Sequence, residues 1–412
     1  MPRKSSVRRR SAPALLPPAL ARKHAAVEVA QPSPVARPSA PASTSSGFAA
    51  ILESASQEIL AVTYWFDPAP HSEPYPVTIR FSGKRSAAKK PLEAGDEFIQ
   101  DETIEQVIPG SGPICVTTKV HNINPGKWVV TARLLEFPHS THGPREPGKE
   151  TTAGGTGLSA ARLWSRWAPS ANLAEPVNTC RLPFAKVPGV LPFIWGTLAT
   201  LGMVVALALQ FLVIALAHLQ GVGLAWAVTL VGIGVGIAAA KVWFAVLHRR
   251  EHRIEGWCIQ GFITGAILAA LLMIALLHVS AGVFLDATVP GLLVAIAVGR
   301  VGCYFAGCCG GPLTASRWGV WSSDQRVGAR RIPTQLLEAL LAVSLGLAAL
   351  VAILLHGPAG GVFFVAGLAA YTLGRQGILR LRAEPSKKWL EAVVTAALAV
   401  LILVIDFAVF AR

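Results

Sequence analysis

Long apolar runs in the second half of the chain constrain its fold more than any other feature. A helix needs about 20 mostly apolar residues to cross the roughly 30 Å hydrocarbon core of a bilayer. We predict seven transmembrane helices, at about 191–217, 221–247, 257–284, 287–306, 334–356, 359–376 and 388–410. The chain is 52% hydrophobic and only 15% charged, with a mean hydropathy of +0.50, which excludes an ordinary soluble protein of 412 residues.

The first half of the chain has a different composition. Residues 1–46 are rich in Ala, Pro, Ser and Arg, which predicts a disordered tail with no cleaved signal peptide. Residues 47–138 contain five short runs rich in β-branched and aromatic residues, separated by turn signals, which favours an immunoglobulin-like or fibronectin-like β-sandwich. Residues 139–188 read as a linker, and 189–412 form the predicted transmembrane domain.

One stretch of the predicted linker has two interpretations. LSAARLWSRWA places Trp164 and Trp167 among arginines, a composition typical of a segment that lies among lipid headgroups. A plain solvent-facing helix fits equally well.

The formal charge of +14 indicates the partners of the chain. The basic residues lie in the tail and in loops between apolar runs, so we expect them to meet anionic lipid headgroups and not nucleic acid. Their distribution over the loops favours a cytoplasmic N-terminus by the positive-inside rule. Six cysteines in a membrane chain do not settle the redox compartment.

Five polar or ionisable side chains fall within the predicted transmembrane helices, where each costs a few kcal/mol unless it is paired or wet. They are Lys241, Gln260, Arg300, Glu338 and Arg375. All five lie near a helix end, so each could extend to the interface. Their joint arrangement with glycines and cysteines favours a functional site.

Arg300 stands in a segment rich in small residues, together with Gly299, Gly302, Gly307, Gly310 and Gly311. Glycines allow close backbone approach, and a guanidinium group offers a planar set of donors to a phosphate. Three cysteines, Cys303, Cys308 and Cys309, follow Arg300. Three interpretations of these cysteines remain open: they fill a tight helix junction, they bind a metal together with Cys258, or they act as redox or catalytic thiols. No histidine lies at ligand spacing, so we assign no metal.

These motifs resemble the signature region of the prolipoprotein diacylglyceryl transferase family. GRVGCYFAGCCGG, then WGV, then RIPTQLLE follow its pattern of Gly-Arg-x-Gly, Trp-Gly and Pro-Ser/Thr-Gln-Leu-Tyr-Glu. FIWGTLATLG at 193–202 is similar to the first-helix motif of the family, and Lys241 takes the place of an arginine. The residues that match or extend the signature include Gly299, Arg300, Gly302, Gln335, Glu338, Tyr371, Arg375 and Arg382.

The resemblance implies a seven-helix enzyme of the bacterial plasma membrane, without a cofactor. It would transfer a diacylglyceryl group from phosphatidylglycerol, or another anionic phospholipid, to the cysteine thiol of a lipobox-containing protein and release glycerol phosphate. Arg300 and Arg375 would then hold the phosphate as it leaves, while Glu338 and Gln335 orient either the loop or these arginines. The residues that would line the substrate site are Lys241, Gly299, Gly302, Gln335, Tyr371 and Arg382.

Several positions depart from the family pattern. Gln260 replaces a histidine thought to transfer protons, and an amide is no general base near neutral pH. Cys303 and Cys308 replace an asparagine and a glutamate of the signature. Two alternatives therefore remain, a lipid-binding membrane protein without turnover and a thiol-dependent membrane protein. The family also places its N-terminus outside the cytoplasm, against the charge rule, so the orientation stays open.

Overall fold

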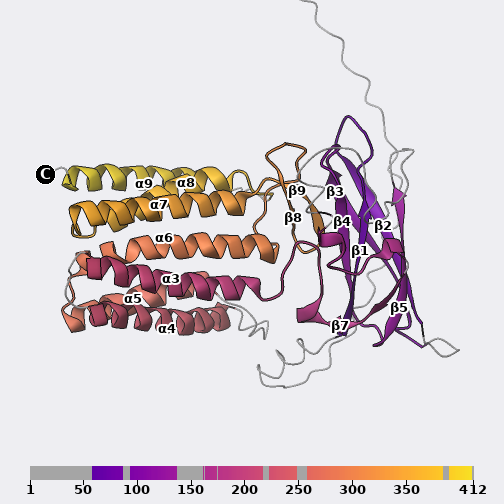
Figure 1. The fold of residues 1–412 in the computed structure, drawn as a ribbon, viewed down its shortest axis with the longest axis horizontal. Helices are drawn as coiled ribbons and strands as arrows, with labels where there is room; N and C mark the ends of the chain where they lie inside the picture. The colour runs from indigo at the N-terminus through magenta and orange to yellow at the C-terminus, as the bar shows by residue number, and fades with distance from the viewer. Residues whose placement is uncertain are drawn as a thin grey trace, which may run out of the picture. The chain divides into compact units, whose positions relative to one another are not determined.

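The computed structural model describes residues 58–86, 93–136, 161, 163–173, 175–216, 222–247, 258–383 and 389–410. The predicted tail at 1–46 lies outside these residues, as does most of the predicted linker before residue 163. Figure 1 shows the described strands and helices with the labels used below.

All five strands predicted from the first half of the chain are present. Their bounds are β1 Glu58–Phe66, β2 Tyr75–Arg85, β3 Glu97–Val107, β4 Ile114–Val120 and β5 Lys127–Glu136. They belong to two sheets, with strand orders β7-β1-β4-β9-β8 and β3-β2-β5-β6. Side chains from both sheets share one buried core that includes Phe66, Phe81 and Trp128. The immunoglobulin-like or fibronectin-like class stays a prediction.

β1 is buried along nearly its whole length because both of its faces are covered. One face joins the core between the sheets. On the other, Trp65 stacks on Trp321 with ring centroids 5.7 Å apart, and Cys115 and Trp164 pack beside them. Trp164 therefore packs against buried residues, an arrangement that neither interpretation of its segment included.

Four short strands come from segments that the sequence reading left without structure. They are β6 Pro176–Asn178, β7 Cys180–Arg181, β8 Val320–Ser323 and β9 Val327–Arg331. β8 and β9 belong to the connection between two transmembrane helices, and β9 pairs with β4 through Cys115↔Gly328 and Val116↔Val327. The connection between these helices thus completes the first sheet.

The second half of the chain forms long apolar helices. Their bounds are α3 Ile194–Leu216, α4 Val222–Leu247, α5 Ile259–Leu277, α6 Ala281–Ala306, α7 Thr334–His356, α8 Val362–Leu379 and α9 Trp389–Phe410. Six of them, α3 to α8, are long and apolar enough to span a membrane. The predicted count of seven is not confirmed, because only Val393–Val404 of α9 qualifies as a shorter apolar helix among the described residues.

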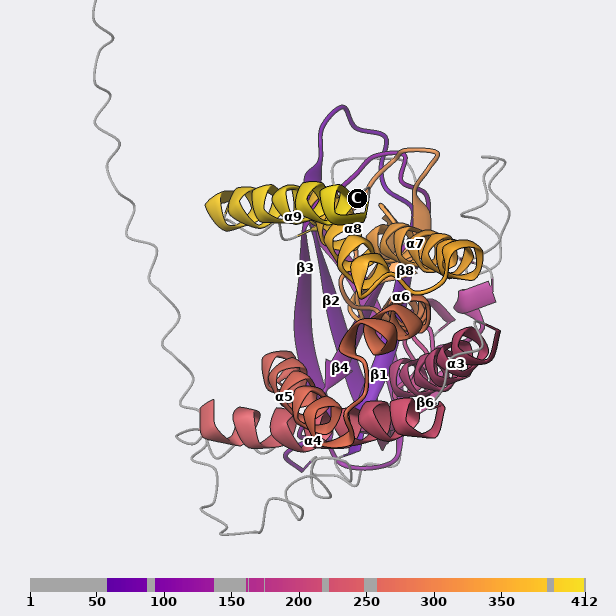
Figure 2. The same cartoon turned by 90° about the vertical axis from the view of Figure 1, so that its left-hand side faces the viewer.

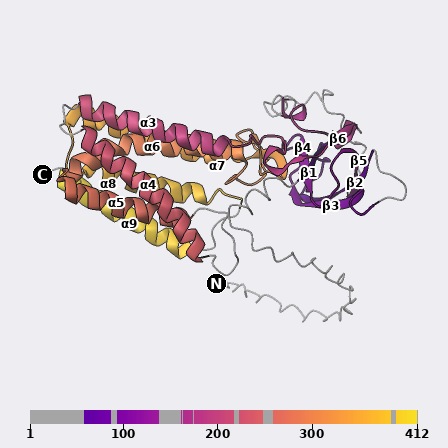
Figure 3. The same ribbon diagram turned by 90° about the horizontal axis from the view of Figure 1, so that it is seen from below.

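Helix packing divides these elements into groups. α6 packs against α3 and α7, and α4 packs mainly against α5. Figures 2 and 3 show α4 and α5 together, apart from α6 and α7. The two groups meet through a small contact between α3 and α4.

One predicted boundary was wrong. We placed a connection around Asp286, but α5 ends at Leu277, His278 takes a left-handed conformation, and α6 already begins at Ala281. Asp286 lies fully buried inside α6, where its carboxylate accepts hydrogen bonds from the backbone N–H groups of Ala359, Gly361 and Phe364. These N–H groups lie at the beginning of α8 and just before it. The Asp286 carboxylate, which the sequence reading placed in a connection, therefore accepts hydrogen bonds that the first turn of α8 leaves unmade.

Candidate functional site

Three arginines surround one buried carboxylate. The Glu338 side chain, 1% exposed, lies 2.6 Å from Arg300 Nε, 2.9 Å from an Arg382 terminal nitrogen and 3.9 Å from Arg375 Nε. The three guanidinium groups and one carboxylate leave a surplus of positive charge. Arg375 Nε and Arg382 Nε are buried and have no hydrogen-bond acceptor among the described residues. We call these four residues the arginine cluster.

The helices bring the arginine cluster together at one end of their group. Arg300 lies near the end of α6, Glu338 near the beginning of α7 and Arg375 near the end of α8, so antiparallel neighbours place the three positions at the same level. Arg382 follows the end of α8. Ionisable groups near helix ends meet the headgroup layer of a bilayer, where an anionic headgroup could reach them.

A bend after α6, residues 307–312, borders the arginine cluster. It begins at Gly307, whose φ of 69° is left-handed, and Cys309 is also left-handed at 61°. Gln335 Nε2 donates to the Cys308 carbonyl at 2.7 Å, and the Thr334 hydroxyl donates to the Cys309 carbonyl at 2.9 Å. α7 therefore holds the bend through its first residues, which places Gln335 in a structural role beside Glu338.

The hairpin of β8 and β9 holds the other side of the bend. Arg331, 7% exposed, donates to Asp324 Oδ2 at 2.6 Å and to the carbonyl oxygens of Val327 and Gly311. We did not single out Arg331 from the sequence. The available signal was its place as the first residue of the RIPTQLLE motif.

Tyr371 and the two glycines occupy different places. Tyr371 is buried on α8 and lies within hydrogen-bonding reach of Arg300. Gly302 faces Trp195 and Leu198 of α3 at contact distance, so it serves helix packing. Gly299 has open space where a side chain would project.

Two predicted site residues lie on the other helix group. Gln260 is exposed near the beginning of α5, and Lys241 is half-buried towards the end of α4. Because α4 and α5 pack mainly on each other, the structure does not group these two residues with the arginine cluster as it groups Arg300, Arg375 and Arg382.

The cysteines near the bend are free thiols. Cys308 Sγ donates to the Cys303 carbonyl at 3.6 Å, and hydrogen bonds from Cys303 and Cys308, with the nearby Arg382 and Arg300, lower the pKa of Cys309. Among the described residues, no group of three or more His, Cys, Asp or Glu side chains has an arrangement that would hold a metal ion.

Together, the fold and the site define a helical membrane protein that carries an arginine cluster and a β-sheet region. Comparison with known proteins agrees with this class. A family model described as prolipoprotein diacylglyceryl transferase matches residues 187–412. The chain therefore belongs to the prolipoprotein diacylglyceryl transferase family, as its signature motifs predicted.

Curated relatives carry the same family name. A phosphatidylglycerol–prolipoprotein diacylglyceryl transferase of Dehalococcoides mccartyi strain 195 is 38% identical over 88 residues, 20% of this chain and 34% of the relative. The enzyme of strain BAV1 is 38% identical over 79 residues, 16% of this chain and 30% of the relative. The chain thus aligns with about a third of the length of these relatives. No solved structure matches the chain.

Proposed function

We propose that this protein transfers a diacylglyceryl group from phosphatidylglycerol to the cysteine thiol of a lipobox-containing acceptor protein. The acceptor sulfur attacks the glycerol carbon that carries the phosphate, so a C–S bond forms and the C–O bond breaks. The electron pair stays on the phosphate oxygen, glycerol phosphate leaves, and the thiol proton passes to a base. Family membership and the names of the relatives support this reaction class.

The observation that carries the proposal is the convergence of Arg300, Arg375 and Arg382 on Glu338. Phosphatidylglycerol has one negative charge on its phosphate, and the leaving glycerol phosphate carries more. A surplus of guanidinium charge stabilises that growing charge, and charge-assisted hydrogen bonds are roughly twice as strong as neutral ones. The buried Nε–H groups of Arg375 and Arg382 are donors that a phosphate oxygen would satisfy.

Glu338 acts in this proposal as a positioning residue. A carboxylate paired with several arginines keeps their side chains in place while no lipid is bound. Two further residues help to position the arginine cluster: Tyr371 lies within hydrogen-bonding reach of Arg300, and Gln335 holds the neighbouring bend.

A second candidate function is lipid binding without transfer. Gln260 favours it, because an amide takes the place of the family histidine and lies exposed on α5, away from the helices of the arginine cluster. The third candidate, a thiol-dependent function of Cys303, Cys308 and Cys309, is favoured by the lowered pKa of Cys309.

A lipidation assay tests the proposed function. The full chain, reconstituted in phosphatidylglycerol membranes, is incubated with a lipobox peptide whose mass is then measured. We expect the peptide to gain one diacylglyceryl group, and Arg300→Ala to abolish the gain. Arg80→Ala, which removes an exposed ion pair with Asp101 on the sheet, is the matched control and should keep activity.

The same assay separates the candidates. Lipid retained without any product would favour binding without transfer. Loss of product on Cys309→Ser with lipid retention intact would favour the thiol-dependent function.

We also propose the wider organisation that the sequence predicts. The chain is a multi-pass protein of the bacterial plasma membrane, with a tail at 1–46, a β-sandwich domain from 47, a linker and a transferase domain from 189. The spanning-capable helices and the family support the membrane location. Its partners are phosphatidylglycerol or another anionic phospholipid and the acceptor protein.

A further inference from the structure

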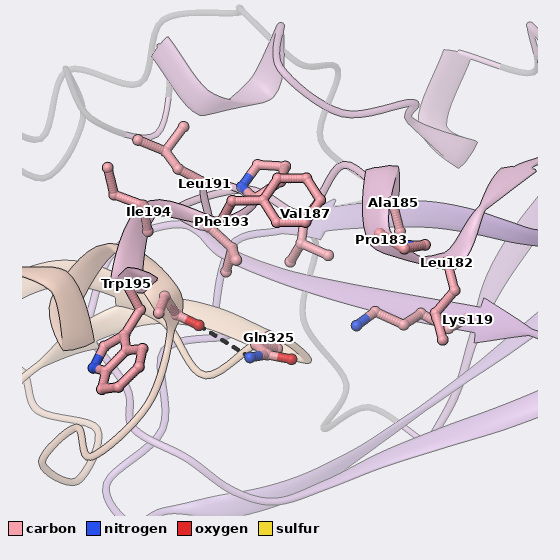
Figure 4. A pocket seen from close by; sticks show the side chains of 13 residues that line it. Lys119, Leu182, Pro183, Ala185, Val187, Leu191, Phe193, Ile194, Trp195 and Gln325 are labelled. Carbon is pink, nitrogen blue, oxygen red and sulfur yellow. Dashed lines mark hydrogen bonds between the residues drawn. The ribbon is translucent and has the colours of Figure 1, made fainter. Parts of the chain in front are cut away.

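A cavity of about 220 Å³ lies between the end of β4 and the beginning of α3 (Figure 4), and its lining includes none of the four residues of the arginine cluster. Its lining includes Lys119 of β4, Leu182, Phe193, Trp195 and Gln325. Lys119 and Leu182 precede residue 187, where the match to the transferase family begins. The cavity is therefore partly built from a segment outside the family match.

Among the described residues that line the cavity, Lys119 is the one with an ionisable side chain. Figure 4 shows its ammonium group pointing towards the space between Phe193 and Gln325. No acidic side chain pairs with Lys119 among the described residues, and burial lowers its pKa. A partly desolvated cation without a counter-charge is costly, and an anion that enters the cavity would repay that cost.

The other polar side chain in the lining is already engaged. Gln325 Nε2 donates to the Ala306 carbonyl at 3.0 Å, at the end of α6. The remaining walls are largely apolar. An occupant therefore needs one anionic group for Lys119 and apolar or weakly polar surface beside it.

The position of the cavity indicates a lipid. α3 begins at Ile194 and is long and apolar enough to span a membrane, so the cavity lies at the end of a span. Phe193 is 65% exposed and Trp195 is 54% exposed there, as aromatic residues of the membrane interface are. Exposed apolar side chains continue from this end along α3 at Leu201, Val204 and Phe211.

We propose that this cavity binds the headgroup of an anionic phospholipid, separately from the arginine cluster. The phosphate contacts the Lys119 ammonium group, the glycerol packs beside Phe193 and Trp195, and the acyl chains follow the exposed face of α3. A volume of about 220 Å³ accommodates a headgroup but not the chains. The site does not depend on the proposed transfer reaction.

Native mass spectrometry of the full chain tests this site. Protein is purified from membranes that contain phosphatidylglycerol and phosphatidylcholine, and the lipids that stay bound are counted. We expect Lys119→Ala to retain phosphatidylglycerol about tenfold more weakly, the effect of one charge-assisted hydrogen bond. Lys119→Arg should restore retention, and Lys127→Ala, at an exposed lysine of β5, should not change it.

Further variants distinguish lipid binding in this cavity from lipid binding at the arginine cluster. Lys119→Ala should weaken retention equally in an Arg300→Ala background, whether or not that protein transfers lipid. Trp195→Ala provides a further test should Lys119→Ala not fold, and it should weaken retention of the same lipid. The proposal is overturned when Lys119→Ala retains as much phosphatidylglycerol as the unchanged chain, or when it loses both lipids equally.

Discussion

The carboxylate of Glu338 determines the geometry of the candidate site because three guanidinium groups depend on it. A buried charge is costly unless it is paired, and here each partner comes from a different place in the sequence: Arg300 from α6, Arg375 from α8 and Arg382 from the segment after it. Matching motif positions predicted that these residues belong to one site. The resemblance already implied that Glu338 orients either the loop or Arg300 and Arg375. The contact of Arg382 with Glu338 could not be predicted, because it depends on where the segment after α8 lies.

Replacing Glu338 by Gln should destabilise the protein. The amide keeps the shape of the side chain but leaves three guanidinium groups without their shared counter-charge, which costs about 3 kcal/mol or more. Thermal unfolding of the purified protein should show a lowered midpoint. Glu105→Gln, at an exposed position on β3, is the control and should leave the midpoint unchanged. Equal midpoints for both variants would contradict the role given to Glu338.

At the scale of single elements, α6 carries two kinds of glycine. At Gly291, an added Cβ would lie 2.5 Å from the Ala206 carbonyl oxygen of α3, so the glycine allows the two helices to approach closely. At Gly299, the same position is open. The sequence marked Gly299 as a site residue and left Gly291 unmentioned, because a glycine that contacts a neighbouring helix looks like any other in a sequence.

Gly291→Ala should therefore destabilise the contact between α3 and α6, whereas Gly299→Ala should be tolerated. We expect a loss of about 1–3 kcal/mol for Gly291→Ala, the usual cost of overpacking. Thermal unfolding of the two variants under the same conditions is the measurement. A larger loss for Gly299→Ala would contradict the packing described here.

The same elements show where sequence patterns succeed. The strands β1 to β5 were predicted because alternation and turn residues are local signals. β8 and β9 were missed because both are short, and because β9 pairs with β4 some 200 residues away in the chain, which no local pattern encodes. Asp286 was assigned to a connection because its three backbone partners belong to another segment of the chain.

On the scale of the whole molecule, the connection between α6 and α7 in the transferase half contributes strands to the first sheet of the β-sheet region. β9 pairs with β4, the Trp321 indole N–H donates to the Pro113 carbonyl, and Arg326 Nε lies 2.9 Å from Glu102 Oε2. The same hairpin holds the bend beside the arginine cluster through Arg331. A domain that looked like a separate module in the sequence thus supports the candidate site.

Gly328→Ala should show this dependence. A Cβ at Gly328 would lie 2.6 Å from Cys115 Sγ and 2.7 Å from the Trp321 ring, so β9 must move away from β4. We expect lower transfer activity, because the bend loses its support, while Gly223→Ala, with open space around it on α4, keeps activity. Normal activity of Gly328→Ala, together with unchanged stability, would show that the hairpin does not support the site.

The proposed role of the arginine cluster is to hold the phosphate of phosphatidylglycerol during transfer, and the release of glycerol phosphate reports on it. Phosphorus NMR follows the release of glycerol phosphate from phosphatidylglycerol membranes by the full chain, with a lipobox peptide as acceptor. We predict release that requires the peptide and falls at least about a hundredfold with Arg375→Ala, as the loss of one preorganised charge in a transition state does. Release that continues unchanged in Arg375→Ala, or that does not require the peptide, would show that the arginine cluster does not act on the phosphate during transfer.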